Sequence, residues 1–389
     1  MYKKDNRKVG IVTYYSFYNY GSSWQAYALA NTINELGYEA RLVDFADYNQ
    51  EWNKKLRKKV LFHRFAAMLH HPTTIKKTLE TKSIGNKVVK LRDEEIQEKF
   101  DNFLNKSLPL SDDDFTSKES GYIAFVCGSD QVWQLDPPGL HYIFFLRFCE
   151  AKKRISYAAS FGTTTIPDYN KSYLKKYLEG FSAISVREDV GVQIVNSVTN
   201  KIVAKQVLDP VLLKATEWWN NKAKRINTPE KYIVCYFLGK PGEYESIIRE
   251  KAANEKASII WISTGFESAQ AEDIVLKPTP EQFLWLIKES FYVFTDSLHG
   301  TEFALTYKKQ FSICKRQYLT GPEQQSRLDS LIRLLRLDNQ LLTIDNSICY
   351  DWPEVDYENI EQILMGERLC SLEYLNDALK NTCDVKKGN

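Results

Sequence analysis

Short apolar runs alternate with helical segments along most of this chain, and the alternation limits the folds that it can adopt. The first apolar run is VGIVTYY (9–15), residues 24–37 have helical character, and YEARLVDF (38–45) is a second apolar run. NYGSS (19–23) is typical of a turn, and Gly37 is a typical helix stop. Strand, loop, helix and strand in this order predict a right-handed βαβ unit.

The same alternation continues to about residue 315. It predicts further strands at 122–129, 154–162, 182–188, 231–239, 258–264, 291–297 and 310–315, and VLDPVLL (207–213) closes the first half. It predicts further helices at 243–255, at 279–290 and from His299 onward. Because strands alternate with helices in both halves, we predict an α/β protein with two doubly wound, Rossmann-like domains that face each other across a cleft.

The length of 389 residues suits two domains rather than one. The polar stretch 214–230 is the expected linker. We expect the N-terminal domain over residues 1–218, with a basic helical insertion at about 50–110, and the C-terminal domain over residues 229–345. Residues 346–389 are expected to form a helical segment that packs back on the N-terminal domain.

Charge, hydropathy and cysteine content exclude several functional classes. The formal net charge is +2, which gives no global signal for nucleic-acid binding. No apolar run approaches the ~18 residues that mark a membrane span, and the N-terminal sequence does not have the pattern of a signal peptide. The seven cysteines are scattered and form no CxxC pair, so we expect a cytoplasmic protein with neither a disulfide framework nor a metal site.

Residues 54–92 form a strongly basic segment, in which Glu80 is the single acidic residue before Asp93. Apolar residues interleave with the bases at roughly helical spacing, and they are Leu56, Val60, Leu61, Phe62, Phe65, Met68 and Leu69. One interpretation is a solvated helical excursion whose apolar stripe faces the core. The other is a basic amphipathic surface that meets anionic lipid or a polyanionic substrate.

Polar side chains follow the predicted strands of the N-terminal half, where parallel sheets bind their ligands. The candidates after the strands at 9–15 and 122–129 are Asn19, Tyr20, Gly21, Ser129, Asp130, Gln131 and Trp133. The carboxylate, amide and indole of the second group are typical of sugar binding, and the alternative for Trp133 is burial in the core. Gly21 allows a tight turn before a helix N-terminus, as either a ligand-facing loop or a plain turn.

Arg187 follows the apolar stretch of the strand predicted at 182–188. A guanidinium at the end of a buried strand needs an anionic partner. That partner is either an anionic ligand or a carboxylate of the chain, such as Glu188.

A histidine lies at a strand-to-helix junction in the C-terminal half, within FYVFTDSLHGTEFAL (291–305). Gly300 and Thr301 follow His299 in the first helical turn, where N–H groups and the helix dipole favour an anion. A histidine beside a bound anion can donate a proton near neutral pH, and a purely structural role is the alternative. Further cations that could hold the anion are Lys315, Arg316 and Arg327.

Seven motifs occur in order along the chain: NYGSSWQAYAL, CGSDQVW, KKRISYAASFG, SVREDVG, VLDPVLL, TDSLHGTEFAL and SRLDSLIRLLRL. Together, from about residue 9 to residue 337, they resemble the polysaccharide pyruvyl transferase family. The resemblance implies a fold similar to the GT-B glycosyltransferases, phosphoenolpyruvate as donor substrate without another cofactor, and a pyruvate ketal on two hydroxyls of one sugar as product. It also implies an acceptor in a capsule or exopolysaccharide, or in its lipid-diphosphate-linked precursor, and a location at the inner face of the membrane.

The resemblance implies roles for individual residues. His299 matches the general acid and Arg187 a ligand of the donor anion, while the chemistry suggests Asp130 as the base for the acceptor hydroxyl. Ser297 stands where some branches of the family carry arginine, so one anion clamp is missing or relocated to Arg327 or Lys315. The expected donor contacts are Arg187, Ser297, Gly300, Thr301, Lys315, Arg316 and Arg327. The expected acceptor contacts are Asn19, Tyr20, Gly21, Gln25, Ser129, Gln131 and Trp133.

Two alternative functions stay open at this point. A nucleotide-sugar glycosyltransferase on the same fold would also bind phosphates at a helix N-terminus, and it would use a carboxylate such as Glu302 or Glu323 for the ribose. A non-catalytic member of the family would have lost its donor clamp, which Ser297 permits, although the chain keeps His299, Arg187 and Asp130 together.

Overall fold

The computed structural model describes residues 7–15, 18–43, 58, 61–62, 65–66, 68–72, 75–76, 94–111, 121–134, 142–316, 325–344 and 352–384. The chain divides into two compact units, each with its own sheet. Unit 1 comprises Met1–Gly85, Leu104–Leu213 and Glu367–Asn389, and unit 2 comprises Asn86–Phe103 and Lys214–Gly366. Most of the basic segment 54–92 lies outside the described residues.

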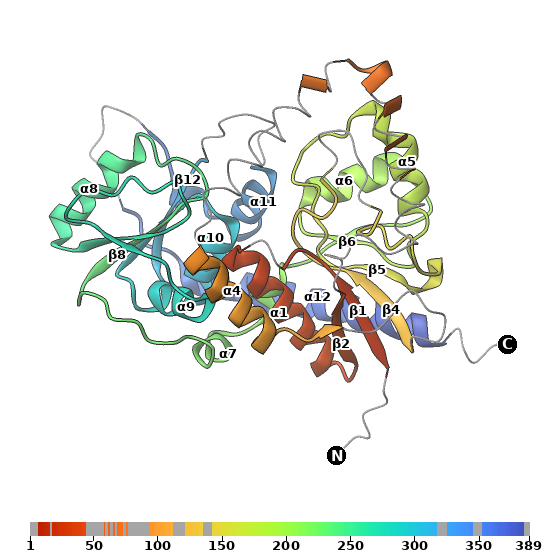
Figure 1. Cartoon of the computed structure of the whole chain (residues 1–389), viewed down its shortest axis with the longest axis horizontal. Helices are drawn as coiled ribbons and strands as arrows, with labels where there is room; N and C mark the ends of the chain where they lie inside the picture. The colour runs from red at the N-terminus through yellow and green to blue at the C-terminus, as the bar shows by residue number, and fades with distance from the viewer. Residues whose placement is uncertain are drawn as a thin grey trace. The chain divides into compact units, whose positions relative to one another are not determined.

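Unit 1 contains a parallel five-stranded sheet in the order β3-β2-β1-β4-β5 (Figure 1). Its strands are β1 (Lys8–Val12), β2 (Glu39–Val43), β3 (Leu110–Ser111), β4 (Tyr122–Cys127) and β5 (Arg154–Ser156), and a separate parallel pair is β6 (Ser185–Val186) and β7 (Lys205–Gln206). Its helices are α1 (Tyr20–Glu35), α5 (Asp168–Leu178) and α6 (Asp189–Val198), with 3-10 turns η1 (Ala151–Lys153) and η2 (Pro210–Leu213).

Unit 2 contains a parallel six-stranded sheet in the order β10-β9-β8-β11-β12-β13. Its strands are β8 (Tyr232–Tyr236), β9 (Ser258–Ile262), β10 (Ile274–Leu276), β11 (Tyr292–Thr295), β12 (Gln310–Cys314) and β13 (Leu341–Leu342). Its helices are α7 (Thr216–Asn220), α8 (Tyr244–Glu255), α9 (Pro280–Glu289), α10 (Leu298–Thr306) and α11 (Ser326–Leu335), with the 3-10 turn η3 (Asp338–Gln340). The unit boundaries fall inside α4 (Glu94–Ser107) and α12 (Tyr357–Asp384).

The two parallel sheets confirm the predicted α/β class. Their central strands β1, β4, β8 and β11 are largely apolar and almost entirely buried, as strands covered on both faces are. Numbered from β8, the order in unit 2 is 3-2-1-4-5-6, the strand order of dinucleotide-binding folds. The chain enters unit 2 at Lys214. The polar stretch 214–230, expected as a linker, therefore belongs to unit 2 and contains α7. Trp219 of this helix is buried and packs edge-on against Phe303.

Several predicted elements end or begin elsewhere for local reasons. The strand predicted at 154–162 stops at Ser156, because Ala158 adopts a left-handed conformation (φ 54°) that a strand cannot accommodate. Only Val186 and its neighbour Ser185 of the stretch 182–188 pair as a strand. The stretch 207–213 forms a 3-10 turn from Pro210, since proline has no N–H for a sheet.

The stretch 19–23, predicted as a turn, is instead the start of α1. The side chain of Asn19 accepts a hydrogen bond from the backbone N–H of Ser22 (3.1 Å), which caps the helix. Gly21 therefore lies in the first helical turn rather than in a loop.

The C-terminal half of α12 belongs to unit 1. Arg368 donates to the carbonyl of Leu212 (2.7 Å), and Tyr374 donates to the carbonyl of Ser156 (2.9 Å). Ser371 accepts from the backbone N–H of Leu208 (3.0 Å). None of the helices within the described ranges combines the length and the apolar character that crossing a membrane requires.

Candidate functional sites at the two sheet switch points

The strand order reverses once in each sheet, and this position is where open parallel sheets bind ligands. In unit 1 the reversal lies between β1 and β4, and in unit 2 between β8 and β11. Polar residues that the sequence singled out follow β1 and β4 in unit 1 and β11 in unit 2. The two switch points are therefore the candidate sites, one in each unit.

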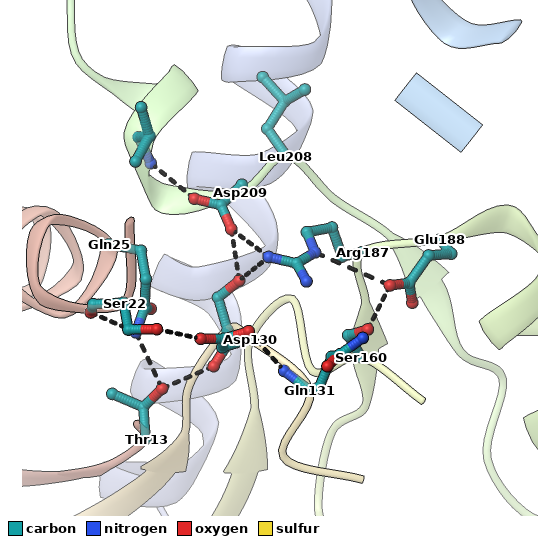
Figure 2. Close-up of polar contacts among 12 residues, drawn as sticks. Thr13, Ser22, Gln25, Asp130, Gln131, Ser160, Arg187, Glu188, Leu208 and Asp209 are labelled. Carbon is teal, nitrogen blue, oxygen red and sulfur yellow. Dashed lines mark hydrogen bonds and ion pairs between the residues drawn. The ribbon is translucent and has the colours of Figure 1, made fainter. Parts of the chain in front are cut away.

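The unit 1 site is centred on Asp130, which follows β4 (Figure 2). Its carboxylate accepts a hydrogen bond from the hydroxyl of Ser22 at the start of α1 (2.5 Å) and another from the backbone N–H of Gln131 (2.8 Å). The side chain is nearly buried, at 9% relative exposure. Two donors fix the direction of the carboxylate, as positioning of a general base requires.

The backbone of Asp130 is in a conformation that few residues other than glycine adopt, with φ of 79°. Its carbonyl accepts hydrogen bonds from the backbone N–H groups of Val132 (2.8 Å) and Ser160 (3.0 Å), and these hold the conformation. Such a conformation costs about 1–3 kcal/mol and occurs most often at functional sites. This cost supports a function for Asp130 beyond packing.

Next to Asp130, two polar side chains, Gln25 and Thr13, connect the ends of β1 and β4 with α1. Gln25, which is fully buried, donates to the hydroxyl of Thr13 (3.1 Å) and to the carbonyls of Tyr14 (2.8 Å) and Ser22 (3.0 Å). Thr13 in turn donates to the carbonyl of Ser129 (2.6 Å). Gln25 thus holds Thr13 and Tyr14, which follow β1, in place from within the core. Its amide group does not face solvent.

Arg187 lies in unit 1 beside Asp209 (Figure 2), in a buried cluster that also includes Ser129. Its Nη1 donates to Oδ2 of Asp209 (2.7 Å) and to the hydroxyl of Ser129 (3.2 Å), which itself donates to the same carboxylate oxygen (2.6 Å). The other carboxylate oxygen of Asp209 accepts from the backbone N–H of Val211 (3.0 Å). The sequence left two possible partners for the Arg187 guanidinium, an anionic ligand or a carboxylate of the chain. In the structure it is paired with the carboxylate of Asp209.

Glu188 adds a second acid beside this cluster. Its Oε1 lies 3.8 Å from Nε of Arg187 and accepts a hydrogen bond from the hydroxyl of Ser160. Both side chains of the Arg187–Asp209 pair are at most 6% exposed. Loss of either partner would leave the other as an uncompensated buried charge.

Trp133 does not have the predicted role in sugar stacking. Its side chain is fully buried, stacks on Phe145 at a centroid distance of 5.5 Å, and donates its indole N–H to the carbonyl of Phe144. It also contacts Phe161 and Phe181. The whole indole ring of Trp133 is packed in the core, which was the alternative interpretation.

The remaining predicted acceptor residues lie close to Asp130 in different settings. Asn19 caps α1 and is half-buried, Tyr20 and Gly21 are buried in its first turn, and Gln131 is half-buried next to Asp130. Ser129 is fully buried and bound to Asp209. Of this set, Asn19 and Gln131 retain surface that a ligand can contact.

The unit 2 site is built around the first turn of α10, directly after β11. Ser297 is the N-cap residue, and its hydroxyl accepts from the backbone N–H of Gly300 (3.3 Å). The hydroxyl of Thr301 donates to the carbonyl of Ser297 (3.1 Å). His299 is the second residue of the helix and is 5% exposed. Ser297 therefore has a structural function as the cap of α10.

Gly300 packs so closely on β11 that no other residue fits. A Cβ at this position would lie 2.3 Å from Oγ1 of Thr295 and 3.0 Å from the ring of Tyr236. Oγ1 of Thr295 cannot move away easily, because it donates to the carbonyl of Tyr236 (2.7 Å) and accepts from the N–H of Ser297 (3.0 Å). This contact sets the distance between α10 and the sheet, and with it the position of His299.

We expect Gly300→Ala to lower the free energy of unfolding by about 1–3 kcal/mol through overpacking. Thermal denaturation measures the change. The control is Gly366→Ala on the exposed side of α12, where a Cβ meets nothing within 4 Å; it should stabilise the helix by about 0.5–1 kcal/mol. Equal effects of the two substitutions would show that α10 does not rest on Thr295.

Asp296 joins the ends of three strands of unit 2. Its carboxylate accepts from the backbone N–H of Leu238 after β8 (2.7 Å) and from Nε of Arg316 after β12 (3.0 Å). Burial raises the pKa of this carboxyl, and the Arg316 guanidinium and the two N–H groups of Leu238 and Gly239 oppose that shift. Arg316 is thus tied to Asp296, whereas the side chain of Lys315 is exposed and that of Arg327 is half-buried in α11.

We expect Arg316→Gln to destabilise the fold by about 1–3 kcal/mol at neutral pH, since it removes a charged donor from a buried carboxylate. The pKa of Asp296 should rise further. A carboxyl whose pKa is raised in the folded state favours folding in its neutral form, and this contribution is lost as the pH rises through the folded-state pKa. The deficit of the variant should therefore shrink as the pH is lowered, in thermal denaturation at a series of pH values.

The exposed Lys315→Gln is the matched control and should leave stability unchanged. A deficit of Arg316→Gln that is the same at every pH would mean that Asp296 does not depend on this guanidinium.

Three residues of these sites were not assigned from the sequence, namely Thr13, Asp209 and Asp296. Asp209 had a signal: a carboxylate followed by proline inside the apolar run VLDPVLL is a buried charge that needs a cation. Thr13 had none, because a threonine at the end of a strand is common.

Solved structures with sequence identities near one tenth cover almost the whole chain. They include a UDP-GlcNAc 2-epimerase from Neisseria meningitidis (10% identity, TM-score 0.43, 96% of this chain and 94% of that one) and a UDP-N-acetylglucosamine 2-epimerase from Rickettsia bellii (12%, 0.41, 95% and 98%). A glycosyltransferase from Streptomyces nogalater matches with 11% identity, a TM-score of 0.41 and coverage of 98% and 99%. No curated protein matches the chain significantly.

The family model for polysaccharide pyruvyl transferases matches residues 19–316, a range that begins at the N-cap of α1 and ends at Arg316. It contains Asp130 and Arg187 of unit 1 and His299 of unit 2. The match covers well over half of the 389 residues and confirms the resemblance seen in the seven motifs. This chain belongs to the polysaccharide pyruvyl transferase family.

Proposed function

We propose that this protein transfers pyruvate from phosphoenolpyruvate onto two hydroxyls of one sugar, with release of phosphate. The acceptor is a sugar of a cell-surface polysaccharide, such as a capsule or exopolysaccharide, or of its lipid-diphosphate-linked precursor. The observation that carries the proposal is the position of His299, in the first turn of α10 at the switch point of unit 2, in a chain of this family.

The reaction needs an acid, and His299 is the candidate. Phosphoenolpyruvate is an enol phosphate, and its methylene carbon takes a proton from the imidazolium to give an oxocarbenium-like centre at the neighbouring carbon. One sugar hydroxyl adds to this centre. The phosphate then leaves with its bonding electrons and the second hydroxyl adds, which closes the ketal. The two hydroxyl protons go to the imidazole and to the leaving phosphate or a base, so the catalyst is regenerated.

The anionic donor needs positive partners, and the first turn of α10 provides part of them. The backbone N–H groups of this turn and the helix dipole favour a phosphate or carboxylate. Arg316 lies at the neighbouring strand end and is held in place by Asp296, and Lys315 is exposed beside it. Arg327 is a further candidate, and direct contact between Arg187 and the donor stays a prediction from the family resemblance.

Unit 1 is assigned to the acceptor, and Asp130 to the base. Its carboxylate is directed by Ser22 and by the N–H of Gln131, and its strained backbone places it beyond the end of β4. A carboxylate held in this way can accept the proton of a sugar hydroxyl as it attacks. Asn19 and Gln131 are the candidate hydroxyl ligands nearby. A protein of this function acts in the cytoplasm or at the inner face of the membrane.

A turnover assay tests the proposal. The protein is incubated with phosphoenolpyruvate and a set of methyl glycosides that differ in their free hydroxyl pairs, and phosphate release is followed. Release that requires both substrates, with a new ketal methyl signal in the product by NMR, is the expected result. Phosphate release that is independent of every sugar, with free pyruvate as the product, would identify a hydrolase and contradict the proposal.

A further inference from the structure

The described part of the basic segment carries an unusual amount of exposed apolar surface. Leu61, Phe62, Phe65 and Leu69 are 54%, 70%, 61% and 64% exposed, and Ile75 is 44% exposed. Among the described residues, ten large apolar side chains are more than a third exposed, and five of them lie within residues 61–75. For these residues, the interpretation of a stripe that faces the core is wrong.

Four of these side chains, Leu61, Phe62, Phe65 and Leu69, belong to residues with helical backbone. Their spacing in the sequence is that of one apolar helical face, at about 100° per residue. Aromatic and aliphatic side chains gathered on one exposed helical face form a surface that water solvates poorly. Such a surface indicates a partner.

The charge around this face is positive. Lys58 and Lys76 are exposed at its two ends, and the sequence from 54 to 92 holds one acid, Glu80, against twelve lysines and arginines. His71 lies beside α5, as its ring is 5.2 Å from that of Tyr169. The exposed residues Lys175 and Lys176 of α5 extend the positive surface.

We propose that the apolar face of residues 61–69, with its surrounding lysines, docks unit 1 on an anionic lipid bilayer. Phenylalanine and leucine side chains enter the boundary between headgroups and acyl chains, while lysines remain at the phosphates. A protein partner would require a complementary acidic and apolar surface of fixed shape, whereas a bilayer needs only the combination found here. The inference deepens the proposed function, because a lipid-linked acceptor lies in that membrane.

Co-sedimentation with vesicles tests the docking without any substrate. The vesicles contain either equal parts of phosphatidylglycerol and phosphatidylcholine or phosphatidylcholine alone. The full chain should bind the anionic vesicles, bind phosphatidylcholine far less, and lose affinity as the salt concentration rises. Phe62→Ser/Phe65→Ser should lower the affinity by roughly tenfold or more, and Lys58→Gln/Lys76→Gln by roughly fivefold for each lysine.

Matched exposed positions serve as controls. Val203→Ser/Val275→Ser removes apolar surface elsewhere, and Lys106→Gln/Lys308→Gln removes charge elsewhere. Both pairs should bind vesicles as the wild type does. All the substituted side chains are exposed, so each variant should keep the wild-type melting temperature.

Equal binding to both vesicle types, no binding to either, or equal losses in test and control pairs would overturn the proposal. Absence of vesicle binding would leave a protein partner for this face. The result is independent of the proposed reaction, because Phe62→Ser/Phe65→Ser should release phosphate from soluble substrates at the wild-type rate. Vesicle binding without any turnover would count against the reaction alone.

Discussion

Replacement of His299 by glutamine is expected to reduce phosphate release from phosphoenolpyruvate by about 10²–10⁴-fold, the usual contribution of a positioned general acid. Glutamine keeps the size and a hydrogen-bond donor but cannot transfer a proton. The loss should appear in kcat rather than in KM, because proton transfer occurs in the transition state. Steady-state kinetics of phosphate release, at saturating and subsaturating donor, measure both parameters.

The matched control for His299→Gln is Ser297→Thr, which keeps a hydroxyl at the N-cap of α10. This variant should stay within a few fold of the wild type. An unchanged kcat in His299→Gln would remove this histidine from the chemistry, even if the reaction itself were demonstrated.

Replacement of Arg187 by methionine is expected to lower the free energy of unfolding by about 3–5 kcal/mol, since it leaves a buried carboxylate without its cation. Asp209, which is 2% exposed, would keep the hydroxyl of Ser129 and the N–H of Val211 as neutral donors but would lose the guanidinium. Chemical or thermal denaturation measures this loss.

Two controls separate the buried pair from a general effect of removing arginine. Arg225→Met, at an exposed position, should change the stability by less than about 0.5 kcal/mol. Arg187→Met/Asp209→Leu should recover much of the loss, because no buried charge remains. A single variant as stable as the wild type would mean that Arg187 is not paired in solution. Because substitution of Arg187 changes the stability of the fold, any stabilisation by the donor in such a variant must be measured relative to the same variant without ligand.

The sequence was sufficient for the central strands of both sheets, because parallel strands covered on both faces form nearly continuous apolar runs that are visible without knowledge of their neighbours. The short edge strands β3, β10 and β13 were not predicted. The junction at His299 was also visible, since β11 is apolar and Ser297 is a typical N-cap residue. Contacts between distant residues were not visible. Arg187 and Asp209 are 22 positions apart, and no local pattern pairs them.

Other differences come from interactions that compete with local preference. Ala158 takes a left-handed conformation, which no property of alanine predicts, so the strand of residues 154–162 was drawn too long. Trp133 fits both a sugar site and a core by its chemistry, and only the neighbouring rings of Phe145, Phe161 and Phe181 decide for the core. The N-cap function of Asn19 was hidden because a cluster of asparagine, glycine and serine such as NYGSS (19–23) is also a turn signal.

The most direct test of the central claim is the melting temperature of the wild type in a titration with phosphoenolpyruvate, because donor binding requires no knowledge of the acceptor. A ligand that binds the folded protein stabilises it by about 2.7 kcal/mol at a hundredfold excess over Kd. The account predicts a rise that depends on the phosphoenolpyruvate concentration and no rise with uridine diphosphate. A rise with uridine diphosphate and none with phosphoenolpyruvate would contradict it and indicate a nucleotide-sugar enzyme.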